Sequence, residues 1–292
     1  MENGSRGDKK LKKVLITGSN GQLGKALNQQ LKDNKNFQVI NTDVDELDIT
    51  KFSEVNEFVK KINPNIIINC AAHTAVDICE KQKDKAYRIN AVGPKNLSVT
   101  AKEIGAVIVQ VSTDYVFDGK KIGKYTESDR ANPQSVYGQT KWEGEEFVRK
   151  TNEKHFIVRT AWLYGDGKNF VRTMLQLAEN SAEIRVVEDQ VGTPTSAKEV
   201  AKVIMKLVET ENYGTYHATC EGQCSWADFS EEIFRLSRKD IHVKRITSEE
   251  YKTAAKRPQN SVLDNKNLRE KIGYSMQGWE DALEEFIAEK IN

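Results

Sequence analysis

The sequence predicts an α/β fold in which a doubly wound parallel sheet is followed by a smaller carboxy-terminal domain. Over the first 163 residues, short runs rich in β-branched residues alternate with longer amphipathic stretches. Such alternation is typical of parallel βαβ units. The run Ile66–Asn69 is almost continuously apolar, as expected for a central strand covered on both faces. A glycine-rich turn also joins the first predicted strand to the first predicted helix.

Five strands are expected in the large domain, because five short apolar runs are bounded by turn or helix signals. They span residues 14–17, 37–41, 66–69, 107–112 and 156–159. Helical patterns at residues 22–33, 51–61, 85–104 and 136–151 fill the gaps between them. Right-handed crossovers then place the carboxyl ends of the strands, and hence a ligand, along one edge of the sheet.

The pattern changes after Leu163. Residues 164–194 are rich in loops, with one helix predicted at 170–179, and residues 196–209 predict a helix that returns to the main sheet. From His217 onward the sequence predicts short helices and irregular segments. We therefore expect a large domain of residues 11–163 and 195–216, and a smaller, substrate-binding domain of residues 164–194 and 217–292. Residues 1–10 are interpreted as a disordered leader.

Charge and hydropathy exclude several classes of partner. The 292 residues include 44 Lys and Arg against 43 Asp and Glu, so the formal net charge is only +1. That balance provides no global field to attract nucleic acid or an anionic membrane. The sequence contains no run of about 18 apolar residues, which is the length needed to span a membrane. Its polar amino terminus has no apolar stretch that resembles a secretion signal. We expect a cytoplasmic protein with no nucleic-acid or membrane partner.

The four cysteines give little support for a metal site. Cys220 and Cys224 lie close to His217, but no second pair of ligands follows them. Cys70 ends an apolar strand, where a small buried thiol is the simpler interpretation. We predict reduced thiols and no bound metal.

Residues 18–24 (GSNGQLG) form a Gly-x-x-Gly-x-x-Gly turn between the first strand and the first helix. Glycine allows the tight turn and lets backbone N–H groups approach a pyrophosphate at the positive end of the helix. Asp43 follows Gly24 by 19 positions at the end of the second strand, where an acid meets the ribose hydroxyls of a dinucleotide. The sequence therefore predicts dinucleotide binding on a Rossmann-type sheet. Asp43 would repel a 2′-phosphate and favours NADH over NADPH.

Tyr137 and Lys141 form a Tyr-x-x-x-Lys pair at the start of a predicted helix, and this spacing places them on one helix face. A free tyrosine has a pKa of about 10, and a nearby ammonium group is expected to lower it toward neutrality. Thr113 directly follows the strand predicted at 107–112 and therefore lies on the predicted ligand edge of the sheet. Its hydroxyl could polarise a substrate carbonyl there. Together with a hydride-donating cofactor, these three residues form a set that can reduce a carbonyl group.

Five further segments make the pattern more specific. They are Asn69–Asp77 (NCAAHTAVD), Ser112–Gly119 (STDYVFDG), Thr160–Gly165 (TAWLYG), Asp189–Thr195 (DQVGTPT) and Arg257–Ser261 (RPQNS). With the glycine turn, Thr113, Tyr137 and Lys141, the chain from about Leu11 resembles the dTDP-4-dehydrorhamnose reductase family of the extended short-chain dehydrogenase/reductase superfamily.

The resemblance implies reduction of the C4 ketone of dTDP-4-dehydro-L-rhamnose to dTDP-L-rhamnose by NADH or NADPH, with Tyr137 protonating the oxygen. The implied catalytic residues are Tyr137, Lys141 and Thr113. The implied cofactor contacts are Gly18, Asn20, Gly21, Gln22, Leu23, Gly24, Asp43, Asp48, Ile49, Ala71, Ala72, His73, Thr74, Ser112, Tyr137 and Lys141. The implied contacts to the dTDP-sugar are Thr113, Asp114, Trp162, Val76 and Arg257.

Several of these residues also have a purely structural interpretation. Asp48 could cap a helix, Trp162 could belong to the core, His73 could be a structural histidine, and Arg257 could be a solvated surface residue. Some members of the family are described as metal-linked dimers that use an acid just after the glycine turn. Lys25 follows Gly24 here, so we expect no metal and leave the oligomeric state open, a homodimer included.

Two other functions fit the same motifs. A related nucleotide-sugar reductase or epimerase would keep the fold and change the sugar. A non-catalytic regulatory subunit would bind a dinucleotide and a partner enzyme. The presence of Thr113, Tyr137 and Lys141 favours catalysis.

Overall fold

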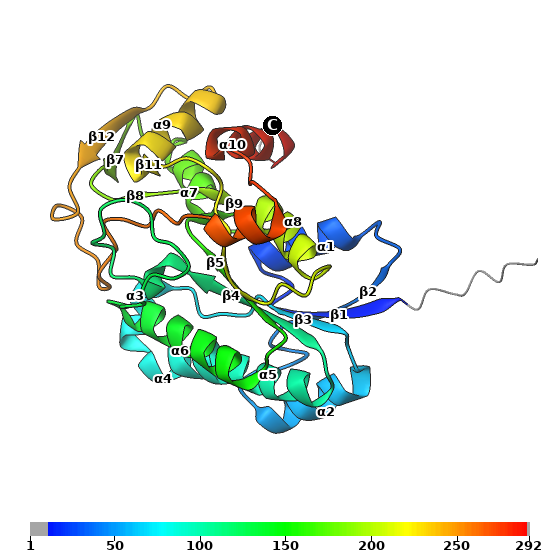
Figure 1. Ribbon diagram of the computed structural model, residues 1–292. Helices are drawn as coiled ribbons and strands as arrows, with labels where there is room; N and C mark the ends of the chain where they lie inside the picture. Colours follow the sequence, from blue (N-terminus) through cyan, green and yellow to red (C-terminus); the bar gives the residue numbers. More distant parts are fainter. Residues whose placement is uncertain (1–10, 291–292) are drawn as a thin grey trace, which may run out of the picture.

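A six-stranded parallel sheet forms the centre of the computed structural model, which describes residues 11–290 (Figure 1). The order of the strands across the sheet is β10-β5-β4-β3-β1-β2. Their bounds are β1 Lys12–Thr17, β2 Phe37–Thr42, β3 Ile66–Asn69, β4 Val107–Thr113, β5 His155–Thr160 and β10 Gly214–His217. The predicted doubly wound α/β fold is therefore confirmed, with β10 as a sixth strand. The expected leader, residues 1–10, lies outside the described residues.

Helices cover both faces of this sheet (Figure 1). On one face, α1 (Gln22–Leu31) packs beside α8 (Ala197–Leu207). On the other face, α5 (Gly93–Glu103) lies between α2 (Phe52–Ile62) and α6 (Val136–Thr151). The apolar sides of these helices form two separate cores with the buried side chains of the strands.

The helix predicted at residues 85–104 is divided into shorter pieces. A short helix α3 (Val76–Lys81) precedes α4 (Lys83–Tyr87), which continues through a π-helical turn at Arg88–Val92 into α5. Asn90 lies in this turn and is fully buried. Its side chain accepts a hydrogen bond from the His73 backbone N–H (2.8 Å) and donates to the His73 carbonyl (3.1 Å). The widened turn therefore anchors the loop that follows β3.

A further core lies in the smaller part of the molecule. Its helices are α7 (Phe170–Leu177), α9 (Trp226–Leu236) and α10 (Trp279–Lys290). Its paired strands are β7 (Glu183–Val187) with β12 (His242–Ile246), β8 (Val191–Gly192) with β11 (Cys224–Ser225), and β6 (Leu163–Tyr164) with β9 (Thr195–Ser196). Leu268 and Met276 pack instead into the core of the main sheet. The division of the chain into two domains at the stated boundaries stays a prediction.

The strand order reverses at β1, which pairs with β2 on one side and with β3 on the other. The connections after β1 and β3 lead to helices on opposite faces of the sheet, α1 and α5, and this arrangement opens a crevice at the carboxyl edge. Gly18 begins the loop after β1 with a φ of +65°. A Cβ atom at this position would lie only 2.6 Å from the backbone nitrogen of Ala71, in the loop after β3. Glycine is thus required both by the backbone conformation and by the close approach of the two loops.

No helix in residues 11–290 is long and apolar enough to cross a membrane.

The close approach at Gly18 can be tested against a matched glycine. Gly105 has a similar φ of +70°, but a Cβ atom added there would meet nothing within 4 Å. Gly105→Ala should therefore lose only about 1 kcal/mol of unfolding free energy, from the left-handed conformation. Gly18→Ala should lose about 1–3 kcal/mol more, because the two loops must separate. Urea unfolding of both variants measures the difference, and equal losses would contradict the proposed contact.

Candidate active site

Two cavities lie at the carboxyl edge of the main sheet, with volumes of about 1010 Å³ and 880 Å³. The larger one extends from the glycine turn to the smaller part of the molecule, and the other is bordered by the segment that follows β2 and by α4. Both are lined by Gly18, Gly21, Cys70 and Ala72. The cavities therefore meet at the point where the strand order reverses.

The amino-terminal end of α1 is suited to an anion. Its N-cap residue is Gly21, which supplies no side-chain hydrogen bond, and its first turn contains no acidic residue. By contrast, side chains cap α6, α7, α8 and α9 through Ser135, Asn169, Ser196 and Ser225. The first N–H groups of α1 thus face the cavity without a side-chain partner, as a pyrophosphate requires. The residues predicted for the turn line the larger cavity: Gly18, Asn20, Gly21, Gln22, Leu23 and Gly24.

Asp43, Asp48 and Ile49 line the smaller cavity, as the cofactor prediction requires. One carboxylate oxygen of Asp43 accepts a hydrogen bond from the backbone N–H of Asn20 (3.1 Å), which ties β2 to the glycine turn. The carboxylate of Asp48 accepts hydrogen bonds from the backbone and the hydroxyl of Thr50. Asp48 therefore stabilises the turn before α2 while one side of it borders the cavity.

The loop after β3 contributes to both cavities. Ala71 and Ala72 line the smaller one, and Thr74 and Val76 line the larger one. His73 is not among the residues that line either cavity. Its backbone is held by Asn90, and its ring Nε2 is buried without a hydrogen-bond partner among the described residues.

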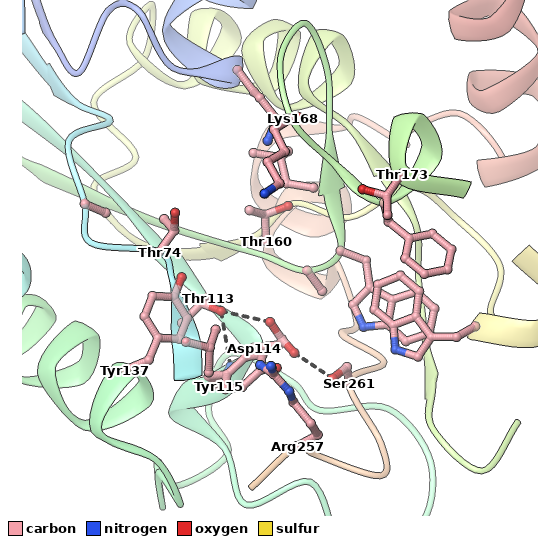
Figure 2. Close-up of a pocket in the computed structure, with 18 of the residues that line it drawn as sticks. Thr74, Thr113, Asp114, Tyr115, Tyr137, Thr160, Lys168, Thr173, Arg257 and Ser261 are labelled. Carbon is pink, nitrogen blue, oxygen red and sulfur yellow. Dashed lines mark hydrogen bonds between the residues drawn. The ribbon is translucent and has the colours of Figure 1, made fainter. Parts of the chain in front are cut away.

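Tyr137 and Lys141 lie on one face of α6 and both line the larger cavity. Ser135 caps the helix by accepting a hydrogen bond from the N–H of Gly138 (3.1 Å). A Cβ atom on Gly138 would lie 2.1 Å from the carbonyl oxygen of Tyr115, so α6 can pack this closely only with glycine there. The rings of Tyr115 and Tyr137 meet edge to face, with centroids 5.3 Å apart. These contacts fix the phenol at the cavity wall (Figure 2).

Burial controls the protonation of this pair. Tyr137 is 9% exposed and Lys141 is 3% exposed. Burial raises the pKa of Tyr137, and the neighbouring Thr113 hydroxyl opposes the shift only in part. Burial also lowers the pKa of Lys141 to about 8, although the carboxylate of Glu145 raises it. The ammonium group of Lys141 donates to the carbonyl oxygen of Val111 (2.6 Å).

The direction expected from the sequence for the pKa of Tyr137 is therefore wrong for this structure. The sequence predicts that Lys141 lowers this pKa, whereas the desolvation of a buried phenol dominates and raises it. The phenol is consequently protonated at neutral pH, which is the state needed to donate a proton.

A chain of buried hydrogen bonds runs from Thr113 to the carboxy-terminal part of the sequence (Figure 2). The hydroxyl of Thr113 donates to one carboxylate oxygen of Asp114 (2.8 Å), and the hydroxyl of Ser261 donates to the other (2.6 Å). Burial raises the pKa of Asp114 to about 6, against the opposing effect of both hydroxyls. The sequence indicates that Thr113 donates to a substrate carbonyl, but in this structure its proton is directed at Asp114. The contact of Ser261 with Asp114 could not be predicted from the sequence, because the two positions are 147 residues apart.

Arg257 is held at the cavity by two specific contacts. Its guanidinium donates to the carboxylate of Asp77 (2.5 Å) and to the hydroxyl of Tyr115 (3.1 Å). The other carboxylate oxygen of Asp77 accepts from the backbone N–H of Ala255 (2.9 Å). The segment around Arg257 is therefore fastened to α3, and the expectation of a freely solvated arginine does not apply.

Trp162 contributes to an aromatic wall of the larger cavity. Its indole stacks on that of Trp226, with ring centroids 3.5 Å apart and planes 8° from parallel. Phe170 packs against Trp226 from α7, with centroids 4.5 Å apart. Trp162 has a φ of +48°, a conformation that is unusual for a bulky residue and that directs it toward this wall. All three rings line the cavity.

The side chains of the described residues form no cluster of three His, Cys, Asp or Glu groups that could hold a metal ion. Cys220 and Cys224 are buried free thiols. Burial raises the pKa of Cys220 to about 12 and also raises that of Cys224.

Comparison with known proteins assigns the chain to a family. Residues 12–291 match the family model described as the RmlD substrate binding domain. The dTDP-4-dehydrorhamnose reductase of Aggregatibacter actinomycetemcomitans is 41% identical over 94% of this chain and 98% of its own length.

Two solved structures are also similar along nearly the whole chain. A dTDP-4-dehydrorhamnose reductase from Clostridium acetobutylicum is 55% identical, with a TM-score of 0.93 over 94% of this chain and 98% of its own. The enzyme of that name from Bacillus anthracis, solved in complex with NADP, is 42% identical, with a TM-score of 0.94 over 96% of this chain and 100% of its own. The chain described above therefore belongs to the RmlD family, the family of the dTDP-4-dehydrorhamnose reductases.

Proposed function

We propose that Tyr137 is the proton donor in an NAD(P)H-dependent reduction of the C4 ketone of dTDP-4-dehydro-L-rhamnose to dTDP-L-rhamnose. The overall reaction follows from membership in the family and from the reductases that the chain resembles. The observation that supports the choice of Tyr137 is its phenol, which borders the larger cavity one helical turn before Lys141, a second residue of the cavity wall. A reductase oxidises one NAD(P)H in each turnover, whereas an epimerase would return its cofactor unchanged. Net oxidation of the cofactor therefore distinguishes the two functions.

The dinucleotide fits the two joined cavities. The uncapped end of α1 would hold its pyrophosphate, while Asp43, Asp48 and Ile49 would border the adenosine half in the smaller cavity. The other half would extend past Ala72, Thr74 and Ser112 toward Lys141. When bound, the reduced cofactor supplies the hydride that attacks the ketone carbon. The reductase from Bacillus anthracis was solved with NADP, and this chain uses NADH or NADPH.

The protein's own groups supply the proton. The raised pKa of Tyr137 keeps its hydroxyl protonated until the ketone oxygen gains negative charge. Lys141 lies four residues later on the same helix face, and its positive charge would stabilise the phenolate that remains. Thr113, whose own proton is directed at Asp114, would present its oxygen to the reacting groups as an acceptor.

The dTDP-sugar would occupy the part of the larger cavity nearest the smaller core. Trp162 would border it from the aromatic wall, and Val76 would border it from α3. Arg257 carries a positive charge suited to the diphosphate, and Asp77 and Tyr115 orient it. Asp114 would act on the sugar through Thr113, whose hydroxyl it orients by accepting a hydrogen bond. A homodimer and a cytoplasmic location stay predictions.

Replacing Tyr137 by Phe tests the proton donor. The Tyr137→Phe variant should lose about 10²- to 10⁴-fold in kcat, the usual contribution of general acid catalysis, with nearly unchanged cofactor affinity. Tyr164→Phe is the matched control, because the Tyr164 hydroxyl is buried without a hydrogen-bond partner among the described residues and does not line the cavity. Steady-state NAD(P)H oxidation measures both variants. Full activity in Tyr137→Phe would assign the proton to another group.

The buried carboxyl group of Asp114 predicts an acid limb in the pH profile. Asp114 has a pKa of about 6, so it is protonated below that pH and can no longer accept both hydroxyl protons. We expect kcat/KM to fall below about pH 6. Ser261→Ala should move this limb to higher pH by about one unit, because it removes a hydrogen bond to the carboxylate. Asp114→Asn should abolish the limb and lower the rate throughout. An identical limb in all three proteins would show that another group titrates.

A further inference from the structure

A buried acidic residue lies one helical turn beyond Lys141 and takes no part in the chemistry described so far. Glu145 is fully buried in the middle of α6. Both of its carboxylate oxygens accept hydrogen bonds from Arg159 on β5, Oε1 from Nε (2.9 Å) and Oε2 from Nη2 (2.6 Å). Arg159 is itself only 4% exposed. Burial raises the pKa of Glu145, but the charge and hydrogen bonds of Arg159, with a smaller effect from Arg149 (Nη2 to Oε2, 3.5 Å), outweigh this, so the carboxyl group is ionised.

Such a pair is a costly way to stabilise a core. The desolvation of two charges offsets most of their attraction, and well-packed apolar residues often serve equally well. The position of the pair is therefore informative. Tyr137, Lys141 and Glu145 follow one another at intervals of four residues, which places all three on one face of α6. A permanent negative charge thus lies directly behind the lysine at the active site.

The groups that face Lys141 come from several elements. The carbonyl of Val111 on β4 accepts its hydrogen bond. The thiol of Cys70, after β3, is neutral, since burial raises its pKa to about 12 despite the nearby ammonium group. On α6 itself, Tyr137 is neutral and Glu145 is ionised. Of the other ionised groups nearby, Asp114 acts on Tyr137. Arg159 and, more weakly, Arg149 act on Glu145; Nη2 of Arg149 lies 3.5 Å from Oε2 of Glu145.

We propose that Glu145 is a positioning residue for the reaction: from within the core, its carboxylate keeps the ammonium group of Lys141 charged, and Arg159 limits how strongly this charge acts. The proposal rests on the proposed function of Lys141 beside Tyr137. It explains how a lysine that is almost fully buried can stay protonated at neutral pH, where desolvation alone would favour the uncharged amine.

The two members of the pair should have opposite effects on Lys141. Glu145→Gln removes the attracting charge and leaves Arg159 to repel the ammonium group, so the pKa of Lys141 should fall by about one unit or more. Arg159→Met exposes Lys141 to the undivided charge of Glu145, so this pKa should rise. The double variant Glu145→Gln/Arg159→Met removes both buried charges and leaves only the partly exposed Arg149 beside position 145. The pKa of Lys141 should therefore fall less than in Glu145→Gln alone.

Two measurements on the full-length protein test this. Competitive acetylation of the lysines between pH 6 and pH 10, followed by peptide mass spectrometry, reports the protonation of Lys141 without any need for turnover. The basic limb of kcat/KM for NAD(P)H oxidation reports the same group during catalysis. Glu143→Gln is the matched control, because this carboxylate lies on the same helix and its Oε1 accepts a hydrogen bond from the neutral side chain of Gln139 (2.7 Å). It should leave both readouts unchanged.

Opposite shifts in Glu145→Gln and Arg159→Met would support the proposal, and shifts in one direction or none would overturn it. Thermal unfolding shows whether each variant folds. If either single variant is unfolded, the double variant decides the matter, because a neutral core pair is well tolerated: an unchanged acetylation profile then contradicts the proposal. Acetylation shifts without any reductase activity would instead contradict the proposed function while leaving the control of Lys141 intact.

Discussion

The burial of one face of α6 is the constraint on which the chemistry of this protein depends. The glycine at position 138 lets the helix approach the backbone of Tyr115 closely, so Tyr137 and Lys141 are almost fully removed from water. Burial shifts both pKa values toward the neutral forms, upward for the phenol and downward for the ammonium group. A buried phenol that retains its proton suits a reductase, because the reaction withdraws that proton only when negative charge develops on the ketone oxygen.

The main sheet and the carboxy-terminal segment each supply part of the site. The reversal of strand order at β1 creates the crevice, and the uncapped end of α1 makes it suitable for a pyrophosphate. The segment from Ala255 to Ser261 then reaches back across the edge of the sheet, where it contacts Asp77 and Asp114. The proposed catalytic and substrate-binding groups are thus joined by polar contacts. Asp114 contacts Thr113, and through it the proposed reaction site. The protonation of Asp114 is therefore expected to change the reaction rate with pH.

Local patterns were sufficient to predict most of the fold and the helix that carries Tyr137 and Lys141. The five strands, the glycine turn and the Tyr137–Lys141 pair each depend on short-range spacing, which the sequence displays directly. Features that depend on contacts between distant segments could not be predicted. The π-helical turn at Asn90 places that side chain in hydrogen-bonding contact with the His73 backbone. The short strand β10 is defined by its pairing with β5. The direction of the pKa shift of Tyr137 was missed for the same reason, since burial is a property of the packed molecule.

The most direct test of the account follows a deuterium label through one turnover. The protein is mixed with dTDP-4-dehydro-L-rhamnose and NAD(P)H that carries deuterium at the transferable C4 position of the nicotinamide. We predict that one cofactor molecule is oxidised for each sugar consumed, and that dTDP-L-rhamnose carries one deuterium at its C4 carbon. A product without the label, or a sugar converted with no net oxidation of the cofactor, would contradict it.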